Sequence, residues 1–183
     1  MGTSARCSRR SSASPEFYSQ AAYRAKVKSP LELVASSIRA LRTATDAGVP
    51  LLQFIARMGQ PMFQYQAPTG FPDRSSTWIN SDTLLMRMNY ALALTANQIR
   101  GTSIEARLLS SGNEDASPDV VLNELSNQLL NGSLSSKTRQ AILETFKTQE
   151  IAASADSVVI SNPQREISAL AALVLASPDF QKR

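Results

Sequence analysis

The chain has 183 residues, of which 43% are hydrophobic and 19% charged, and its formal net charge is +4. A chain of this length can bury a core without the help of disulfides or metals. It contains no histidine and a single cysteine, so it cannot supply a Ser-His-Asp triad, a Cys-His dyad, a histidine-bearing zinc site, a four-cysteine cluster or an internal disulfide. We therefore expect no cofactor and no metal site.

The first fifteen residues, MGTSARCSRRSSASP, contain three arginines, five serines and no acidic residue. They lack the apolar run of a secretory signal peptide, and we expect residues 1–15 to be a disordered leader before a single helical domain over residues 16–183. No stretch has the roughly 18 apolar residues of a membrane span. The first 60 residues carry nine Lys or Arg against three acidic residues, which is too thin a basic stripe to predict a nucleic-acid partner.

Two helices are predicted in this basic first third. Residues 29–32, Ser-Pro-x-Glu, form a helix start in which the serine caps free amides, proline suits the first turn and glutamate reaches back. Apolar residues then recur at helical spacing until Gly48, and Pro50 starts a shorter helix that stops at Gly59. We expect the two to form a helical hairpin.

A third helix is predicted from Asn80 and Ser81 to about Arg100. Apolar residues leave it little polar face, so we expect it to be the central, most buried helix. Arg87 and Asn89 are the exceptions. A buried charge is costly unless it is paired, so we expect Arg87 to form an ion pair within the protein or to reach the surface, with a ligand contact as the alternative.

Three more helices follow in the acidic last part of the chain. They begin at Ser117-Pro118, at Ser135 or Ser136, and at Asn162-Pro163. A capping residue followed by proline recurs as the start signal. No segment has enough strand signal to build a sheet. The sequence thus predicts an all-α fold, an irregular bundle of about six helices.

The long loop at 59–80 contains two glycines and three prolines, and we expect no helix in it. It also holds four of the eleven aromatic residues, Phe63, Tyr65, Phe71 and Trp78. Loops of this length inside a compact domain are enriched in function, but aromatic side chains also pin loops to the body. A buried Trp78 would favour a packed connector, and an exposed Trp78 would favour a binding surface.

Catalytic motifs are absent from the sequence, which has no nucleophile elbow, no P-loop and no dinucleotide-binding glycine motif. We therefore predict no catalytic residue. Asp73 and Asp82 flank the loop and would form a carboxylate pair if the loop folds back. The candidate ligand or partner surface combines the aromatic residues of the loop with polar residues near them: Gln60, Phe63, Tyr65, Phe71, Asp73, Trp78, Asn80, Arg87 and Asn89.

Three segments carry a family resemblance. They are FYSQAAYRAKVKSPLELV, MGQPMFQYQAPTGFPDRSSTWINSDTLLMRMNYALAL and LVLASPDFQKR. In order, they contain a Lys-Ser-Pro-x-Glu-x-Val helix start, a Met-Gly-Gln-Pro turn, a Pro-x-Gly-aromatic-Pro loop, a Trp-Ile-Asn helix entry and a final Ser-Pro-Asp-Phe-Gln. Together, over residues 17–183, the chain resembles the C-terminal portion of the bacterial family known as domain of unknown function 1800.

The resemblance implies a predominantly helical protein that is frequently exported and has no established activity. Family members are several hundred residues long, and their histidine-containing N-terminal part has no counterpart here, so we expect this chain to be a fragment. The favoured hypothesis is an interaction or structural segment of a larger exported bacterial protein. It would have no complete active site of its own, and its partner would be its own N-terminal region or another exported protein.

Two alternatives stay open. The chain is either half of an enzyme or ligand-binding site that the N-terminal region completes, or a polysaccharide- or peptide-binding module that uses the aromatic loop.

Overall fold

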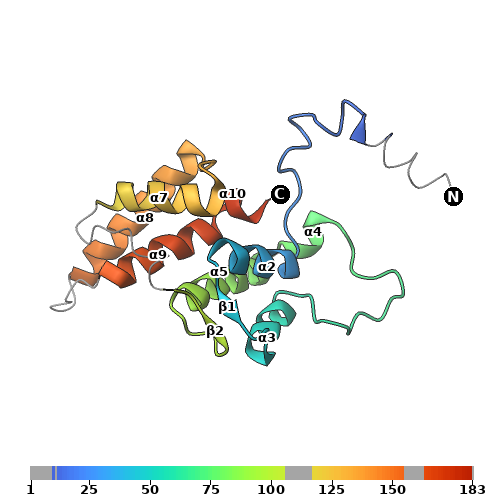
Figure 1. The fold of residues 1–183 in the computed structure, drawn as a ribbon, viewed down its shortest axis with the longest axis horizontal. Coiled ribbons are helices and arrows are strands. Elements are labelled where there is room, and N and C mark those ends of the chain that lie inside the picture. The colour runs from blue at the N-terminus through green and yellow to red at the C-terminus, as the bar shows by residue number, and fades with distance from the viewer. Residues whose placement is uncertain (1–9, 11, 106–116, 155–162, 183) are drawn as a thin grey trace.

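The computed structural model describes residue 10 and residues 12–105, 117–154 and 163–182. Within these ranges the fold is almost entirely helical, with eight helices of which six are longer than one turn (Figure 1). The prediction of an all-α fold with about six helices is confirmed. Cys7 and most of the expected leader lie outside the described residues, so that expectation stays a prediction. No helix in the described part is long and apolar enough to cross a membrane.

Helix α2 (Pro30–Ala40) begins where the sequence predicts. The Ser29 hydroxyl accepts a hydrogen bond from the Glu32 amide at 3.4 Å, and the Ser29 amide donates to Glu32 Oε2 at 2.8 Å. This capping box satisfies amides that have no partner within the helix. Helix α3 (Val49–Arg57) follows and packs against α2, as the predicted hairpin requires.

Helix α5 (Ser81–Thr95) begins at the predicted Asn80 cap, but it is not the most buried helix. Leu85, Met88 and Leu92 on one of its faces are about half exposed. The prediction of all-round burial is wrong because α5 has apolar residues on every face and packs against its neighbours on one side only.

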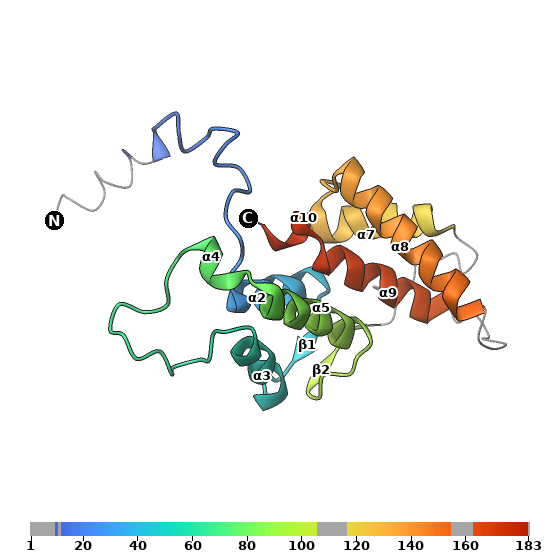
Figure 2. The same ribbon diagram turned by 180° about the vertical axis from the view of Figure 1, so that it is seen from behind.

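The most central helix is instead α9 (Pro163–Ala176). It packs against α5 and against α7 (Pro118–Leu130), α8 (Ser136–Ser154) and α10 (Pro178–Gln181). Figures 1 and 2 show α9 between α5 on one side and α7 with α8 on the other. Ala171 on α9 is fully buried, and a side chain this small lets neighbouring helices approach closely.

A small antiparallel sheet corrects the expectation that no sheet forms. Strand β1 (Ala44–Thr45) pairs with β2 (Thr102–Ser103) and ties the segment after α2 to the segment after α5. Each strand has two residues. That is too short for the alternation of apolar and polar residues from which strands are predicted.

The predicted loop 59–80 ends in a short helix, α4 (Ser75–Trp78). The expectation that the whole segment is non-helical is therefore wrong. All of its glycines and prolines precede Ser75, so the residues that break helices do not affect Ser-Ser-Thr-Trp. The remaining part, residues 59–74, projects from the body between α3 and α4 (Figures 1 and 2).

Candidate functional site

Three of the four loop aromatics form a row from the core towards the surface. The Trp78 side chain is buried, with 3% of its surface exposed. The centre of the Phe71 ring lies 6.0 Å from that of Trp78, and the Tyr65 ring lies 4.4 Å from Phe71. Ring contacts of this kind supply the apolar packing that a projecting loop otherwise lacks. Trp78 therefore anchors the loop, as expected of a packed connector.

Phe63 lies outside this row and is 98% exposed. Its backbone is left-handed, with φ of 61°, a conformation that bulky residues rarely adopt. Tyr65 is also exposed, although one side of its ring contacts Phe71. The outer part of the loop thus presents two aromatic rings to solvent.

Gln60 and Asn80 act as helix caps. Gln60 Oε1 accepts a hydrogen bond from the Leu31 amide in the first turn of α2 at 2.9 Å. Asn80 Oδ1 accepts from the Thr83 amide at 2.8 Å, and Thr83 Oγ1 accepts from the Asn80 amide at 3.0 Å. Both side chains satisfy backbone amides that the helices leave free, so their geometry is explained by structure.

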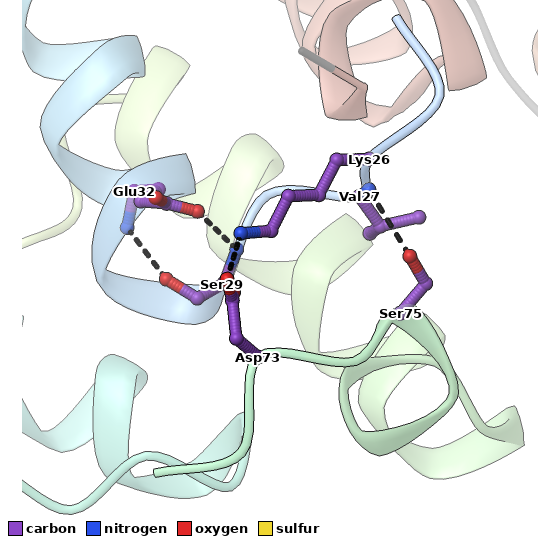
Figure 3. Close-up of polar contacts among 6 residues, drawn as sticks. All are labelled: Lys26, Val27, Ser29, Glu32, Asp73 and Ser75. Atoms are coloured by element: carbon purple, nitrogen blue, oxygen red, sulfur yellow. Dashed lines mark hydrogen bonds and ion pairs between the residues drawn. The ribbon is translucent and has the colours of Figure 1, made fainter. Parts of the chain in front are cut away.

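Asp73 ties the end of the loop to the segment before α2. Its carboxylate pairs with Lys26, and Ser75 Oγ accepts a hydrogen bond from the Val27 amide at 3.4 Å (Figure 3). The Asp73 side chain is 76% exposed, so this ion pair stabilises the fold little. Asp82 lies in the first turn of α5, where the helix dipole favours an acidic residue. The structure therefore gives each of the two carboxylates a separate role.

Arg87 is fully buried on α5 and contacts two other segments. Its Nη2 donates to the Lys28 carbonyl oxygen at 2.8 Å, and its Nη1 donates to Gln181 Oε1 at 3.1 Å. Its Nε has no hydrogen-bond partner within the described residues. Burial lowers the pKa of Arg87 to about 10. Among the described residues two neutral oxygens thus take the place of the expected acidic partner.

Two segments far apart in the sequence meet beside Arg87. The Lys28 amide donates to the Gln181 carbonyl oxygen at 2.8 Å, and Val27 forms an isolated antiparallel bridge with Lys182. We call these contacts, together with the two hydrogen bonds of Arg87, the clamp. The Lys-Ser-Pro motif and the final Ser-Pro-Asp-Phe-Gln motif therefore meet in space and have a structural role.

The Lys28 side chain lies at the edge of the clamp. Its Nζ is 3.9 Å from the centre of the Phe180 ring, a cation–π contact. Burial and the nearby Arg24 lower the pKa of Lys28 to about 8, and Glu32 opposes this shift. The amine is thus less strongly charged at neutral pH than an ordinary lysine.

Asn89 does not share a face of α5 with Arg87. Successive helical residues are about 100° apart, so positions 87 and 89 point in nearly opposite directions, and Asn89 is exposed. Leu85, Met88 and Leu92 are 54%, 47% and 50% exposed and follow one another at intervals of three and four residues. This spacing places them along one line of the helix, which we call the α5 stripe.

A groove of about 480 Å³ opens beside the α5 stripe. It lies between the first half of α8 and the junction of α9 with α10, and Met88 of the stripe lines it. Ala141, Ile142 and Leu173 give it an apolar lining, with hydroxyls such as that of Thr138 among them. Its volume falls within the range of roughly 300–1,000 Å³ that is usual for ligand pockets. The stripe and the groove therefore meet at Met88.

The sequence model of the DUF1800 family, described as a protein of unknown function, matches residues 5–182. The chain belongs to the DUF1800 family. The match confirms the resemblance and extends it to nearly the whole chain. No curated protein matches the chain, and no solved structure does. A functional proposal for this DUF1800 chain therefore depends on its geometry.

Sequence reasoning missed the two apolar features of this DUF1800 chain. Leu85, Met88 and Leu92 were expected in the core, and residues of α8 were not considered as a site. A signal for the stripe was present in the sequence, because α5 is apolar on every face. Such a helix is usually covered on all sides, so a face that this chain leaves uncovered is a candidate contact surface. Within the described residues no group of three or more His, Cys, Asp or Glu is placed to hold a metal ion.

Proposed function

We propose that this chain is an interaction segment of a larger, exported DUF1800 protein. It would dock an apolar helix from the N-terminal region of that protein on the α5 stripe, and it would have no complete active site of its own. The observation that carries the proposal is the stripe itself, a line of half-exposed apolar side chains on a helix whose other face is in the core.

The chemistry of the stripe favours a helical partner. Exposed apolar side chains gathered on one surface mark interaction sites more often than isolated ones do. Positions spaced three and four residues apart match the spacing of apolar residues on a second helix. Met88 also lines the groove, which lies beside the stripe and is not part of the surface proposed for the helix.

The family resemblance favours the N-terminal region as the partner, and it is also the basis for an exported location. Longer family members carry such a region ahead of the segment that this chain matches. Within one polypeptide docking is intramolecular, so a modest apolar surface is enough to hold the two parts together.

The alternatives have less support from the contacts. A ligand site shared with N-terminal histidines would need the Arg87 guanidinium, which donates to oxygens of this chain. A polysaccharide platform would need exposed rings in a plane, whereas Trp78 is buried and Tyr65 and Phe71 are tilted by 40°.

The test is co-expression of this chain with the N-terminal region of a long DUF1800 protein, followed by calorimetry on the purified parts. We expect a complex, and we expect the pair Leu85→Glu and Leu92→Glu to weaken binding by about 30-fold or more, as loss of an interface centre does. Val49→Glu, on the exposed start of α3, is the matched control and should bind normally. Absence of a complex, or equal binding by the Glu pair, would contradict the proposal.

A further inference from the structure

The segment before the clamp carries exposed aromatic side chains. In residues 12–24, which we call the arm, Phe17, Tyr18 and Tyr23 are 58%, 75% and 69% exposed. The arm backbone forms successive turns held by hydrogen bonds within the segment. Exposed rings gathered on one short segment leave apolar surface in water, which association would bury.

The arm joins the body close to the groove. Arg24 donates from Nη2 to Ser133 Oγ at 2.6 Å and from Nη1 to the Ser133 carbonyl oxygen at 3.4 Å. Ser135, two residues further on, lines the groove. Arg24 has a left-handed backbone, with φ of 51°, so the chain turns at this point. From there the arm runs away from α7, α8 and α9 (Figures 1 and 2).

The arm and the groove match in chemistry. Tyrosine combines an apolar ring with a hydroxyl, so it suits a site that is apolar but contains hydrogen-bonding groups. The groove has that character, with Leu173 and Ala141 beside the charged side chains of Lys137 and Asp179, whereas the hydroxyls of Thr138 and Ser177 are hydrogen-bonded within the chain. Each copy of the chain has one arm and one groove.

We propose that the arm of one copy packs its two exposed tyrosines into the groove of a second copy, and that the exchange is reciprocal. Tyr23 directly precedes the Arg24 contact and Tyr18 lies six residues before it, so both rings stay within about 20 Å of that contact and would meet a second copy whose groove faces it. It points away from its own groove, which favours a second copy over the same one. Reciprocal exchange closes a two-fold symmetric dimer, because the same two surfaces meet twice. The inference goes beyond the proposed function, since it assigns a second copy to the groove and leaves the α5 stripe to the N-terminal helix.

Sedimentation velocity of the full chain over a wide concentration range tests the exchange. We expect a monomer–dimer equilibrium. The arm variant Tyr18→Ser/Tyr23→Ser and the groove variant Ala141→Arg should each raise the dimer Kd by about tenfold or more. Ala141 is exposed on α8, where arginine is a good helix former, so the groove variant keeps the fold. Phe63→Ser, which changes an exposed ring elsewhere, is the control and should dimerise normally.

Mixing the two variants separates exchange from misfolding. The groove variant keeps an intact arm and the arm variant keeps an intact groove, so the mixture can form one complete contact. We expect a heterodimer, detected with a fluorescent label on one variant, that is tighter than either homodimer. A wild-type chain that is monomeric throughout, or a dimer unaffected by both variants, would overturn the inference.

The dimerisation experiment and the binding experiment of the proposed function can fail independently of each other. If the chain stays monomeric but binds the N-terminal region through Leu85 and Leu92, only the arm exchange fails. If it forms arm-dependent dimers but does not bind that region, only the proposed function fails.

Discussion

At the scale of single residues, Arg87 shows how a charge on an apolar helix is used for structure. A buried cation is costly, and it is usually stabilised by an acidic partner. Here the guanidinium donates to two neutral oxygens that lie 59 and 94 residues away in the sequence. One side chain therefore joins α5 to the segment before α2 and to α10.

Replacement of Arg87 by alanine should make the folded protein less stable. We expect Arg87→Ala to lower the free energy of unfolding by roughly 2–4 kcal/mol, because it leaves a cavity and two oxygens without donors. Arg57→Ala, at the exposed end of α3, should change it by about 0.5 kcal/mol or less. Urea titrations followed by circular dichroism compare the two. Equal stability of the two variants would show that the clamp does not hold the fold.

The candidate residues also show where sequence reasoning stops at this scale. Residue type and loop position selected Gln60 and Asn80, and its charge on an apolar helix selected Arg87, but residue type does not specify the atom that each will contact. The cap by Asn80 is a local contact, because its partner Thr83 is three residues away, and asparagine before an apolar run is a usual helix start. Gln60 caps an amide 29 residues away, and such a distant contact leaves no local pattern.

At the scale of elements, the helix starts and the Gly59 stop of α3 were predictable, and the ends of α2 and α5 were not. The starts depend on local signals, such as the Ser-Pro-x-Glu box of α2 and the Asn80 cap of α5. Both helices end earlier than predicted, before Arg42 and Asn97, which adopt left-handed backbone with φ of 45° and 54°. The expected stop signal was glycine, so these two ends were missed.

Two asparagines, Asn80 that caps α5 and Asn89 within it, allow a matched test of a cap. We expect Asn80→Ala to lower the free energy of unfolding by about 1 kcal/mol, because the Thr83 amide loses its acceptor. Asn89→Ala changes an exposed position within the same helix and should cost about 0.5 kcal/mol or less. Thermal unfolding of both variants measures the difference. A larger loss for Asn89→Ala would mean that Asn89 has a role that the contacts do not explain.

At the scale of the whole molecule, burial is set by the arrangement of the helices. Helix α9 is central because four other helices pack against it. Its apolar composition resembles that of α5, so composition alone did not distinguish them. The class of fold followed from spacing and caps, whereas the central helix, the α5 stripe and the groove depend on contacts between distant segments.

The burial of Trp78 in the loop leads to a prediction for the unfolding of the whole chain. Trp78 is the single tryptophan and is buried, so we expect blue-shifted fluorescence that is lost on addition of urea. Since α4 packs with the body, this loss should coincide with the loss of helical circular dichroism in one transition. A tryptophan signal that changes at lower urea than the helical signal would show that the loop unfolds separately.

The clamp also determines how the molecule responds to a pulling force. Val27 and Lys182 face each other in antiparallel orientation, next to the hydrogen bond between Lys28 and Gln181. Tension applied just outside this pair would therefore act on its contacts one after another, as in a zipper, and not on all of them at once. Bonds opened in sequence resist little force, so the clamp would separate before tension reached the packed helices.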